Sequence, residues 1–243
     1  MIIHLYAVCY NEKDMLPYFL KYYETIVDKM FIFDNESTDG SDKILKSHSK
    51  IQAFSFKSDG INDSIMTGIY NEAYKKHSRG SADWIICADI DEIILSPRMN
   101  LRDILQEMLE NNVMIPHMAG FQMVSERFIK SDKQIYEICK WGVRDPVYDK
   151  TAIFRPEIDI NFHIGRHRSS PVSDKYLLSS WDSLALLHYK FFGRQRYLDK
   201  QKESCIRISE TNKKNKYGLY HKDQKKANEF FSYTLNCARE VIG

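Results

Sequence analysis

The sequence has 243 residues, of which 43% are hydrophobic and 28% charged, and its formal net charge is +2. This length and composition suffice for a buried core and exclude disordered and collagen-like classes. No apolar run approaches the about 18 residues of a membrane span. The five cysteines are widely spaced without a CxxC pair, so neither a zinc site nor a disulfide framework is expected. The first residues show no secretory leader, and we expect a cytoplasmic protein.

The first 95 residues alternate between strand-like and helix-like segments. Apolar runs of strand length lie at 2–9, 29–33, 51–56 and 84–88, and helical patterns lie at 14–26, 42–48 and 62–77. The run 84–88 is continuously apolar, which is typical of a central parallel strand covered on both faces. Thr38 or Asp39 is expected to cap the second helix. In the third helix the positions expected to face inward are Ile65, Ile69, Tyr70 and Ala73.

The second half is less regular. A helix is predicted at 101–109, strands at 120–126, 151–154 and 184–189, an alternating apolar segment at 158–164, and helices from 193 onward with a polar interruption at 212–218. Strands that alternate with helices predict an α/β fold with a doubly wound, mostly parallel sheet, followed here by a helical C-terminal extension. Ligands of such sheets gather at the carboxyl ends of the strands.

The sharpest motif is Asp89-Ile-Asp-Glu92, which follows the buried run 84–88. Asp89 and Asp91 project to the same side of an extended segment. Two adjacent carboxylates repel unless a proton or a cation lies between them. Mg²⁺ or Mn²⁺ accepts such oxygen ligands and can bridge to a diphosphate, whereas the alternative is a solvated acidic turn. Asp34, at the end of the second strand, can accept hydrogen bonds from a base or a ribose, or can belong to a helix-capping turn.

Three segments, Ala7-Val-Cys-Tyr-Asn-Glu12, Asp34-Asn-Glu-Ser-Thr-Asp-Gly-Ser41 and Asp83-Trp-Ile-Ile-Cys-Ala-Asp-Ile-Asp-Glu92, resemble glycosyltransferases of the GT-A fold. The resemblance is greatest to the family 2-like group, with echoes of family 92. It implies a GT-A, Rossmann-like fold in which residues 1–95 bind a nucleotide-sugar, residues 96–192 form the acceptor side and residues 193–243 form a basic helical extension. The implied nucleotide-binding residues are Asn11, Glu12, Asp34 and Asp89, and the implied metal and diphosphate ligands are Asp89 and Asp91.

The second half resembles the same group more weakly, through Lys150-Thr-Ala-Ile-Phe-Arg-Pro156 with His163, and through Leu187-His188-Tyr189. The resemblance implies His188 as third metal ligand, and neutral imidazole is acceptable beside two carboxylates. A structural histidine is the alternative, and His163 is the second candidate ligand. An inverting transferase needs a general base near the acceptor hydroxyl. The candidates by position are Asp145 and Asp149, with Glu157 behind them, and all three could equally be loop carboxylates.

Charge is unevenly distributed along the chain. Residues 190–243 carry 13 Lys and Arg against 6 Asp and Glu, whereas residues 1–189 carry 22 against 27. The basic end could contact an anionic membrane or the pyrophosphate of a lipid-linked acceptor, and a solvated helical surface is the alternative. The near-neutral total and the acidic first half argue against nucleic-acid binding.

These features predict a cytoplasmic glycosyltransferase of the hexosyltransferase type, of inverting mechanism, peripheral to the inner face of the membrane. It would use Mn²⁺ or Mg²⁺ and a UDP-sugar, and the acceptor would be a hydroxyl of a glycan or lipid-linked glycan. One alternative is a sugar-phosphate nucleotidyltransferase, although residues 10–14 lack the glycines normally found after its first strand. The other is a non-catalytic module that binds a nucleotide or sugar without needing the Asp89 and Asp91 pair. Motifs of Rossmann dehydrogenases, P-loop NTPases and α/β-hydrolases are absent from the sequence.

Overall fold

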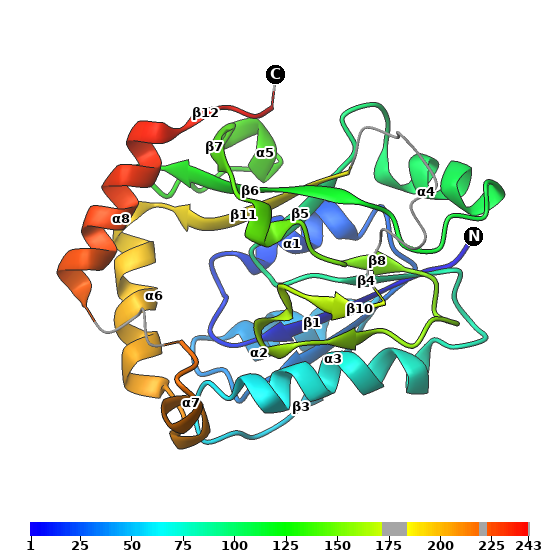
Figure 1. Cartoon of the computed structure of the whole chain (residues 1–243), viewed down its shortest axis with the longest axis horizontal. Coiled ribbons are helices and arrows are strands. Elements are labelled where there is room, and N and C mark those ends of the chain that lie inside the picture. Colours follow the sequence, from blue (N-terminus) through cyan, green and yellow to red (C-terminus); the bar gives the residue numbers. More distant parts are fainter. Residues whose placement is uncertain (172–183, 219–222, 243) are drawn as a thin grey trace.

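The structure is a computed structural model that describes residues 1–171, 184–218 and 223–242. Its first sheet has the strand order β3-β2-β1-β4-β8 (Figure 1). The strands are β1 (Ile3–Cys9), β2 (Lys29–Asp34), β3 (Ile51–Ser55), β4 (Trp84–Cys87) and β8 (Ile153–Phe154). The first four are parallel, and only β8 runs antiparallel to its neighbour β4. The predicted α/β fold with a doubly wound, mostly parallel sheet is confirmed for this half of the chain.

Both faces of this sheet are covered by helices. The helices of this half are α1 (Leu16–Tyr23), α2 (Ser41–Ser47) and α3 (Asp63–His77). Along β1, Leu5 packs in one apolar core with α1, whereas its neighbour Tyr6 packs in a second core with Tyr70 and Tyr74 of α3. Successive side chains of a strand point to opposite faces, so a strand between two helical layers must be apolar throughout.

The second sheet has the order β12-β7-β6-β11-β5. Its strands are β5 (Glu92–Leu95), β6 (Met118–Ser125), β7 (Trp141–Arg144), β11 (Leu184–Phe192) and β12 (Arg239–Glu240), and the helices α4 (Leu101–Glu110) and α5 (Ile135–Ile138) belong to the same region. Only β6 and β11 are parallel to each other. Short elements connect the two sheets: η1 (Pro146–Tyr148), β9 (Asn161–Phe162), η2 (Ile164–Arg166) and β10 (Ser169–Ser170).

The C-terminal segment is built into the fold. It forms α6 (Arg194–Arg207), α7 (Glu210–Asn215) and α8 (Gln224–Cys237), and β12 then pairs with β7. The end of α6 is bound to the loop before α3, because Ile61 N–H donates to the Arg207 carbonyl at 2.6 Å. Gly60, at φ +109, allows this approach, since a Cβ there would lie 1.9 Å from that carbonyl oxygen. The predicted helical C-terminal extension is therefore packed against the rest of the fold.

Several local predictions differ from the structure. Ile65 is exposed, because the inward face of α3 is formed by Thr67, Tyr70, Ala73 and Tyr74. The N-cap of α2 is Gly40, and Thr38 and Asp39 do not cap it; Asp39 accepts instead from the backbone of Lys13 and Ser41. Part of the predicted interruption at 212–218 is helical, since Ser209 caps α7. The segment 158–164 contains only the two-residue strand β9, although Ile158, Ile160 and Phe162 are buried as the alternation predicts.

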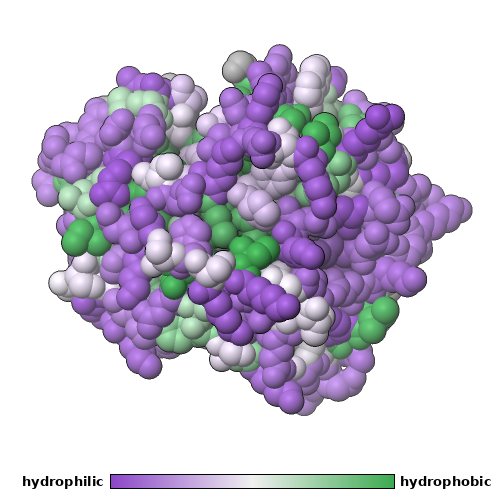
Figure 2. Space-filling view, turned by 180° about the vertical axis from the view of Figure 1, so that it is seen from behind, coloured by the Kyte–Doolittle hydropathy of each residue, from purple (hydrophilic) through white to green (hydrophobic). Residues whose placement is uncertain are grey.

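The outer surface agrees with this inward packing of apolar residues. The face seen in Figure 2 is mainly hydrophilic, and its hydrophobic residues form small, separate groups. Among the helices of the described residues, none has the length and apolar character needed to cross a membrane.

Candidate functional site

A cavity of about 380 Å³ opens where β1, β2 and β4 end. Its wall includes Tyr10 and Glu12 after β1, Asn35 after β2, and Asp89 to Asp91 after β4. The opposite wall is formed by α6, which contributes Arg196, Lys200, Glu203 and Arg207. The polar clusters that follow parallel strands thus meet at one edge of the sheet, as their topology requires.

Asp89 is held between cationic side chains. Its Oδ1 lies 2.5 Å from Arg166 Nη2, and its Oδ2 lies 3.8 Å from Lys150 Nζ. The Tyr70 hydroxyl donates to the same carboxylate at 3.1 Å. Burial by itself would raise the pKa of Asp89, but Arg166 and Lys150 outweigh it and lower the pKa to about 2. Asp89 is therefore an ionised carboxylate that the protein itself neutralises.

Arg166 reaches this position through an unusual backbone. Gly165 has φ +75 and Arg166 has φ +57, so the chain turns sharply inside η2. The guanidinium lies 3.8 Å from the centroid of the Tyr70 ring, and Nη1 donates to the Cys87 carbonyl at 3.2 Å. A non-glycine residue in the left-handed region costs free energy and is found where the surroundings hold it in place. Arg166 is buried, and the sequence contains no signal that singled it out.

Asp91 faces a histidine from the second sheet. Its Oδ2 lies 3.4 Å from His188 Nε2, and its backbone carbonyl accepts from Tyr189 N–H at 2.7 Å. The antiparallel pairing of β5 with β11 sets His188 opposite Glu92 and so brings the imidazole to Asp91. Burial opposes ionisation of Asp91, but the neighbouring His188 outweighs it and holds the pKa of the carboxyl well below its usual range.

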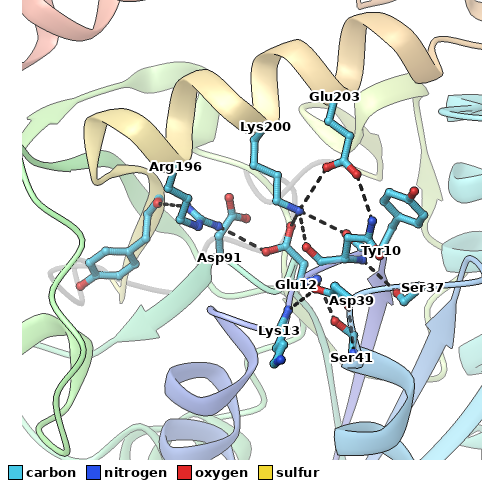
Figure 3. A network of polar contacts seen from close by, with 12 residues as sticks. Tyr10, Glu12, Lys13, Ser37, Asp39, Ser41, Asp91, Arg196, Lys200 and Glu203 are labelled. Carbon is cyan, nitrogen blue, oxygen red and sulfur yellow. Dashed lines mark hydrogen bonds and ion pairs between the residues drawn. The ribbon is translucent and has the colours of Figure 1, made fainter.

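Glu12 connects the loop after β1 to α6 (Figure 3). Its carboxylate lies 3.0 Å from Lys200 Nζ and 3.3 Å from Arg196 Nη2. Burial raises the pKa of Glu12, although both cations oppose that shift. Asn11 Nδ2 donates to Glu203 at 3.0 Å, and Lys200 also donates to the Asn11 carbonyl at 2.5 Å. This network fixes α6 against the loop.

The cavity wall is rich in cations. Six Lys and Arg residues line it against five carboxylates: Lys150, Arg166, Lys190, Arg196, Lys200 and Arg207 against Glu12, Asp63, Asp89, Asp91 and Glu203. Four of these six cations come from β11 and α6, the part of the chain whose positive charge suggested a membrane or lipid-linked acceptor. Four of the 13 basic residues of 190–243 therefore line the cavity, and contact of the basic end with a membrane stays a prediction.

Two predicted nucleotide-binding residues do not line the cavity. The Asp34 carboxylate accepts hydrogen bonds from the Ser37 N–H at 3.1 Å and from the Ser37 hydroxyl at 2.5 Å, so its hydrogen bonds close the turn that follows β2. Asn11 accepts the Thr38 N–H at 2.8 Å and joins the loop to α6. Glu12 and Asp89 do line it, and Asn35, which the sequence reasoning overlooked, lines it after β2.

The predicted general bases also lie outside the cavity wall. Asp145 accepts hydrogen bonds from Gln122 Nε2 at 2.9 Å and from Val147 N–H at 3.1 Å. Asp149 lies 2.5 Å from Arg144 Nη2 and accepts Gly120 N–H at 2.8 Å. Glu157 pairs with Arg155, and His163 is exposed and is not among the residues that line the cavity. Each of these carboxylates is already bound by neighbouring groups of the protein, and a role as general base stays a prediction.

The donor set fits a divalent cation only in part. Among the described residues there is no group of three His, Cys, Asp or Glu side chains arranged to hold a metal. Asp89 faces Arg166 and Lys150 and is a poor ligand in this arrangement. Asp91 and His188 are a suitable pair, because Mg²⁺ and Mn²⁺ are commonly held by one or two side chains together with substrate phosphates. With two protein ligands, a cation at this position would need further ligands from a bound phosphate.

Comparisons with known proteins assign no family to the chain. No family model and no curated protein matches it. Similar solved structures include the 4-diphosphocytidyl-2C-methyl-D-erythritol synthase of Anaerococcus prevotii, at 8% identity and a TM-score of 0.38, covering 95% of this chain and 96% of that chain. Another is a cytidylyltransferase of Leptospira borgpetersenii, at 14% identity and a TM-score of 0.31, covering 64% and 60%. At these identities and scores, the similarities assign no function to this chain.

The comparisons do not bear out the predicted glycosyltransferase. No model of glycosyltransferase family 2 or 92 matches the sequence, since no family model matches at all. The similar structures are described as a diphosphocytidyl-methylerythritol synthase and a cytidylyltransferase, names that agree better with the alternative interpretation from the sequence. Of the residues in the three motifs that were predicted to bind ligands, Glu12, Asp89 and Asp91 line the cavity, and their role in binding stays a prediction.

Proposed function

We propose that this chain is a nucleotidyltransferase that joins a phosphorylated small molecule, such as a sugar phosphate, to a nucleotide. A phosphate oxygen of the small molecule attacks the α-phosphorus of a nucleoside triphosphate and forms a new P–O bond. The bond from the α-phosphorus to the bridging oxygen of the β-phosphate breaks, and pyrophosphate leaves with that electron pair. The observation that carries the proposal is the cavity wall, on which six cations face five carboxylates.

The excess of cations on the wall favours phosphorylated substrates. Each of the five carboxylates already has a partner: Lys200 for Glu12, Asn212 for Asp63, Arg166 for Asp89, His188 for Asp91 and Asn11 for Glu203. A phosphate monoester is ionised at neutral pH, because its second pKa is about 6. It can attack without a general base, whereas a hydroxyl nucleophile requires one. A cationic cavity with partnered carboxylates supports a phosphate nucleophile.

The cationic side chains would hold the phosphates and orient the attack. Arg196 and Lys200 extend from α6, and Arg166 and Lys150 lie across the cavity beside Asp89. Placing fixed cations where charge accumulates stabilises a transition state without reorganisation during the reaction. A divalent cation held by Asp91, His188 and the nucleotide would add neutralisation of the departing pyrophosphate.

The reverse reaction tests the proposal directly. The protein is incubated with pyrophosphate, Mg²⁺ or Mn²⁺, and each of a panel of nucleoside diphosphate sugars, and formation of nucleoside triphosphate is measured. We expect triphosphate to form from at least one member of the panel. Arg196→Met should lower kcat/KM by about 100-fold or more, the usual cost of removing one fixed charge from a transition state.

Lys202→Met is the matched control, because Lys202 is exposed on the same helix and lies outside the cavity wall. This variant should retain the wild-type rate. Release of nucleoside diphosphate from the sugar, with no triphosphate formed from pyrophosphate, would overturn the proposal. Nucleotide binding without turnover in either direction would overturn it as well and would identify a binding module.

A further inference from the structure

Asp63, the first residue of α3, differs from the other carboxylates of the cavity wall. Each of those lies beside a lysine, arginine or histidine: Glu12 beside Lys200, Asp89 beside Arg166, Asp91 beside His188, and Glu203 beside Lys200. Within the described part of the chain, Asp63 forms no ion pair, and its carboxylate bonds the neutral amide of Asn212. Burial raises the pKa of Asp63, and Asn212 opposes that shift only in part. Asp63 therefore brings an uncompensated negative charge to a wall with an excess of cations.

Asn212 holds Asp63 at two points. The Asp63 N–H donates to Asn212 Oδ1 at 3.1 Å, and Asn212 Nδ2 donates to Asp63 Oδ2 at 3.1 Å. Asn212 is itself fully buried in α7, where its N–H donates to Ser209 Oγ at 3.0 Å. These bonds fix the Asp63 side chain through one of its two oxygens. The other oxygen, Oδ1, has no partner among the described residues and can accept a hydrogen bond from a ligand.

The position of Asp63 along α3 separates it from the cations that surround Asp89. Asp63, Thr67 and Tyr70 have the spacing of one helical face, and all three line the cavity. The Tyr70 hydroxyl donates to Asp89, and Tyr70 lies about 10 Å along the helix axis from Asp63. A phosphate is attracted to the cations beside Asp89 and repelled by Asp63. The part of a nucleotide next to Asp63 must therefore be an uncharged part.

Apolar and aromatic side chains adjoin Asp63. Ile61 and Met66 line the same cavity. The Ile61 N–H binds the carbonyl of Arg207, whose guanidinium lies 3.1 Å from the centroid of the Tyr10 ring. Aromatic and guanidinium groups of this kind stack on the flat face of a base. The ribose connects the base to the phosphates, and its hydroxyls are uncharged hydrogen-bond donors.

We propose that Asp63 accepts a hydrogen bond from a ribose hydroxyl of the bound nucleotide, so that the cavity selects ribonucleotides over deoxyribonucleotides. The inference rests on the proposed function for the nucleotide itself. Asn212 is a positioning residue, which holds Asp63 in place without neutralising its charge. A hydrogen bond to a charged acceptor is stronger than one between neutral groups. A site built to bind a hydroxyl rejects the analogue that lacks it, because a polar group of the site is then left unpaired.

Equilibrium binding measures this selection without turnover. Isothermal titration calorimetry in the presence of Mg²⁺ compares ATP, CTP, GTP and UTP with their 2′-deoxy and 3′-deoxy forms, with no sugar phosphate added. We expect the wild type to bind at least one ribonucleotide more tightly than one of its deoxy forms, by about 10-fold or more, the effect of one hydrogen bond to a charged group. In Asp63→Ala the two affinities should become equal. Loss of a negative charge increases the attraction of every triphosphate alike, so it leaves their ratio unchanged.

Asp59→Ala is the matched control, because Asp59 precedes α3 in the same loop, binds Asn62 and lies outside the cavity wall. It should keep the wild-type ratio of affinities. Asp63→Asn is a second test that preserves the shape of the side chain. An amide that accepts from Asn212 turns its NH₂ group away from that bond and offers no second oxygen to a hydroxyl, so this variant should also lower the ratio.

Equal binding of the ribose and deoxy forms by the wild type would overturn the inference, and this is the result expected if Asp63 binds the sugar phosphate instead. A wild-type ratio in both Asp63 variants would overturn it as well. The reverse reaction is a separate measurement. Triphosphate formation without ribose selection would overturn this inference alone, whereas ribose selection without triphosphate formation would overturn the proposed function alone. Failure to bind any of the four ribonucleotides would overturn both.

Discussion

Replacing Lys150 with methionine should destabilise the protein strongly. Lys150 Nζ lies 2.5 Å from Glu92 Oε1, and their side chains are 2% and 0% exposed. Methionine preserves most of the aliphatic chain, so the main change is a buried carboxylate that loses its cation. Breaking a buried ion pair in this way costs about 3 to 5 kcal/mol.

The surroundings of Glu92 place the expected loss near the lower end of that range. After the substitution Glu92 still accepts Asp89 N–H at 3.0 Å, and Arg166 Nη2 lies 3.9 Å away. We therefore expect a loss of about 3 kcal/mol in the free energy of unfolding. With a urea m value of about 3 kcal/mol/M, the midpoint of unfolding should fall by about 1 M.

Urea titrations followed by circular dichroism measure this change. Lys46→Met is the control, because Lys46 forms an exposed pair with Asp42 and its side chain is 71% exposed. It should alter the free energy of unfolding by less than about 0.5 kcal/mol. The double variant Lys150→Met/Glu92→Gln should regain part of the loss, since no buried charge is then left alone. Equal effects of Lys150→Met and Lys46→Met would refute the reasoning.

Two further predictions concern the backbone and the pH dependence of stability. Gly60→Ala should lower the melting temperature and weaken nucleotide binding, because the new Cβ would collide with the Arg207 carbonyl. Gly68→Ala is the control: Gly68 lies inside α3, a Cβ there would have no atom within 4 Å, and the substitution should stabilise the protein by about 0.5 to 1 kcal/mol. An undiminished melting temperature in Gly60→Ala would contradict the docking of α6. Burial lowers the pKa of His4 from 6.5, so the folded state takes up this proton at lower pH than the unfolded state. The free energy of unfolding should therefore fall as the pH drops below about 6.5. Chemical denaturation between pH 7 and pH 5 should show a smaller fall in His4→Gln than in the wild type. An identical fall in both proteins would exclude His4 as a source of this pH dependence.

The local pattern of the sequence was sufficient to predict much of the first half. The segments 2–9, 29–33, 51–56 and 84–88 agree with β1 to β4, because strands buried on both faces must be apolar along their whole length. Because these strands alternate with helices along the chain, they were predicted to be parallel. The carboxyl ends of parallel strands share one edge of the sheet. That geometry is why Glu12, Asp89 and Asp91 were correctly expected near one another.

Tertiary structure alone decided what surrounds those residues. Arg166 enters the cavity through two consecutive left-handed residues, and His188 enters through the register of β11 against β5. Arg196 and Lys200 arrive from a helix more than 100 residues along the chain from Glu12, held there by ion pairs. Charge and periodicity in a sequence report a residue's own neighbours along the chain. The balance of cations and carboxylates in a cavity depends on segments far apart in sequence, and only their packing determines that balance.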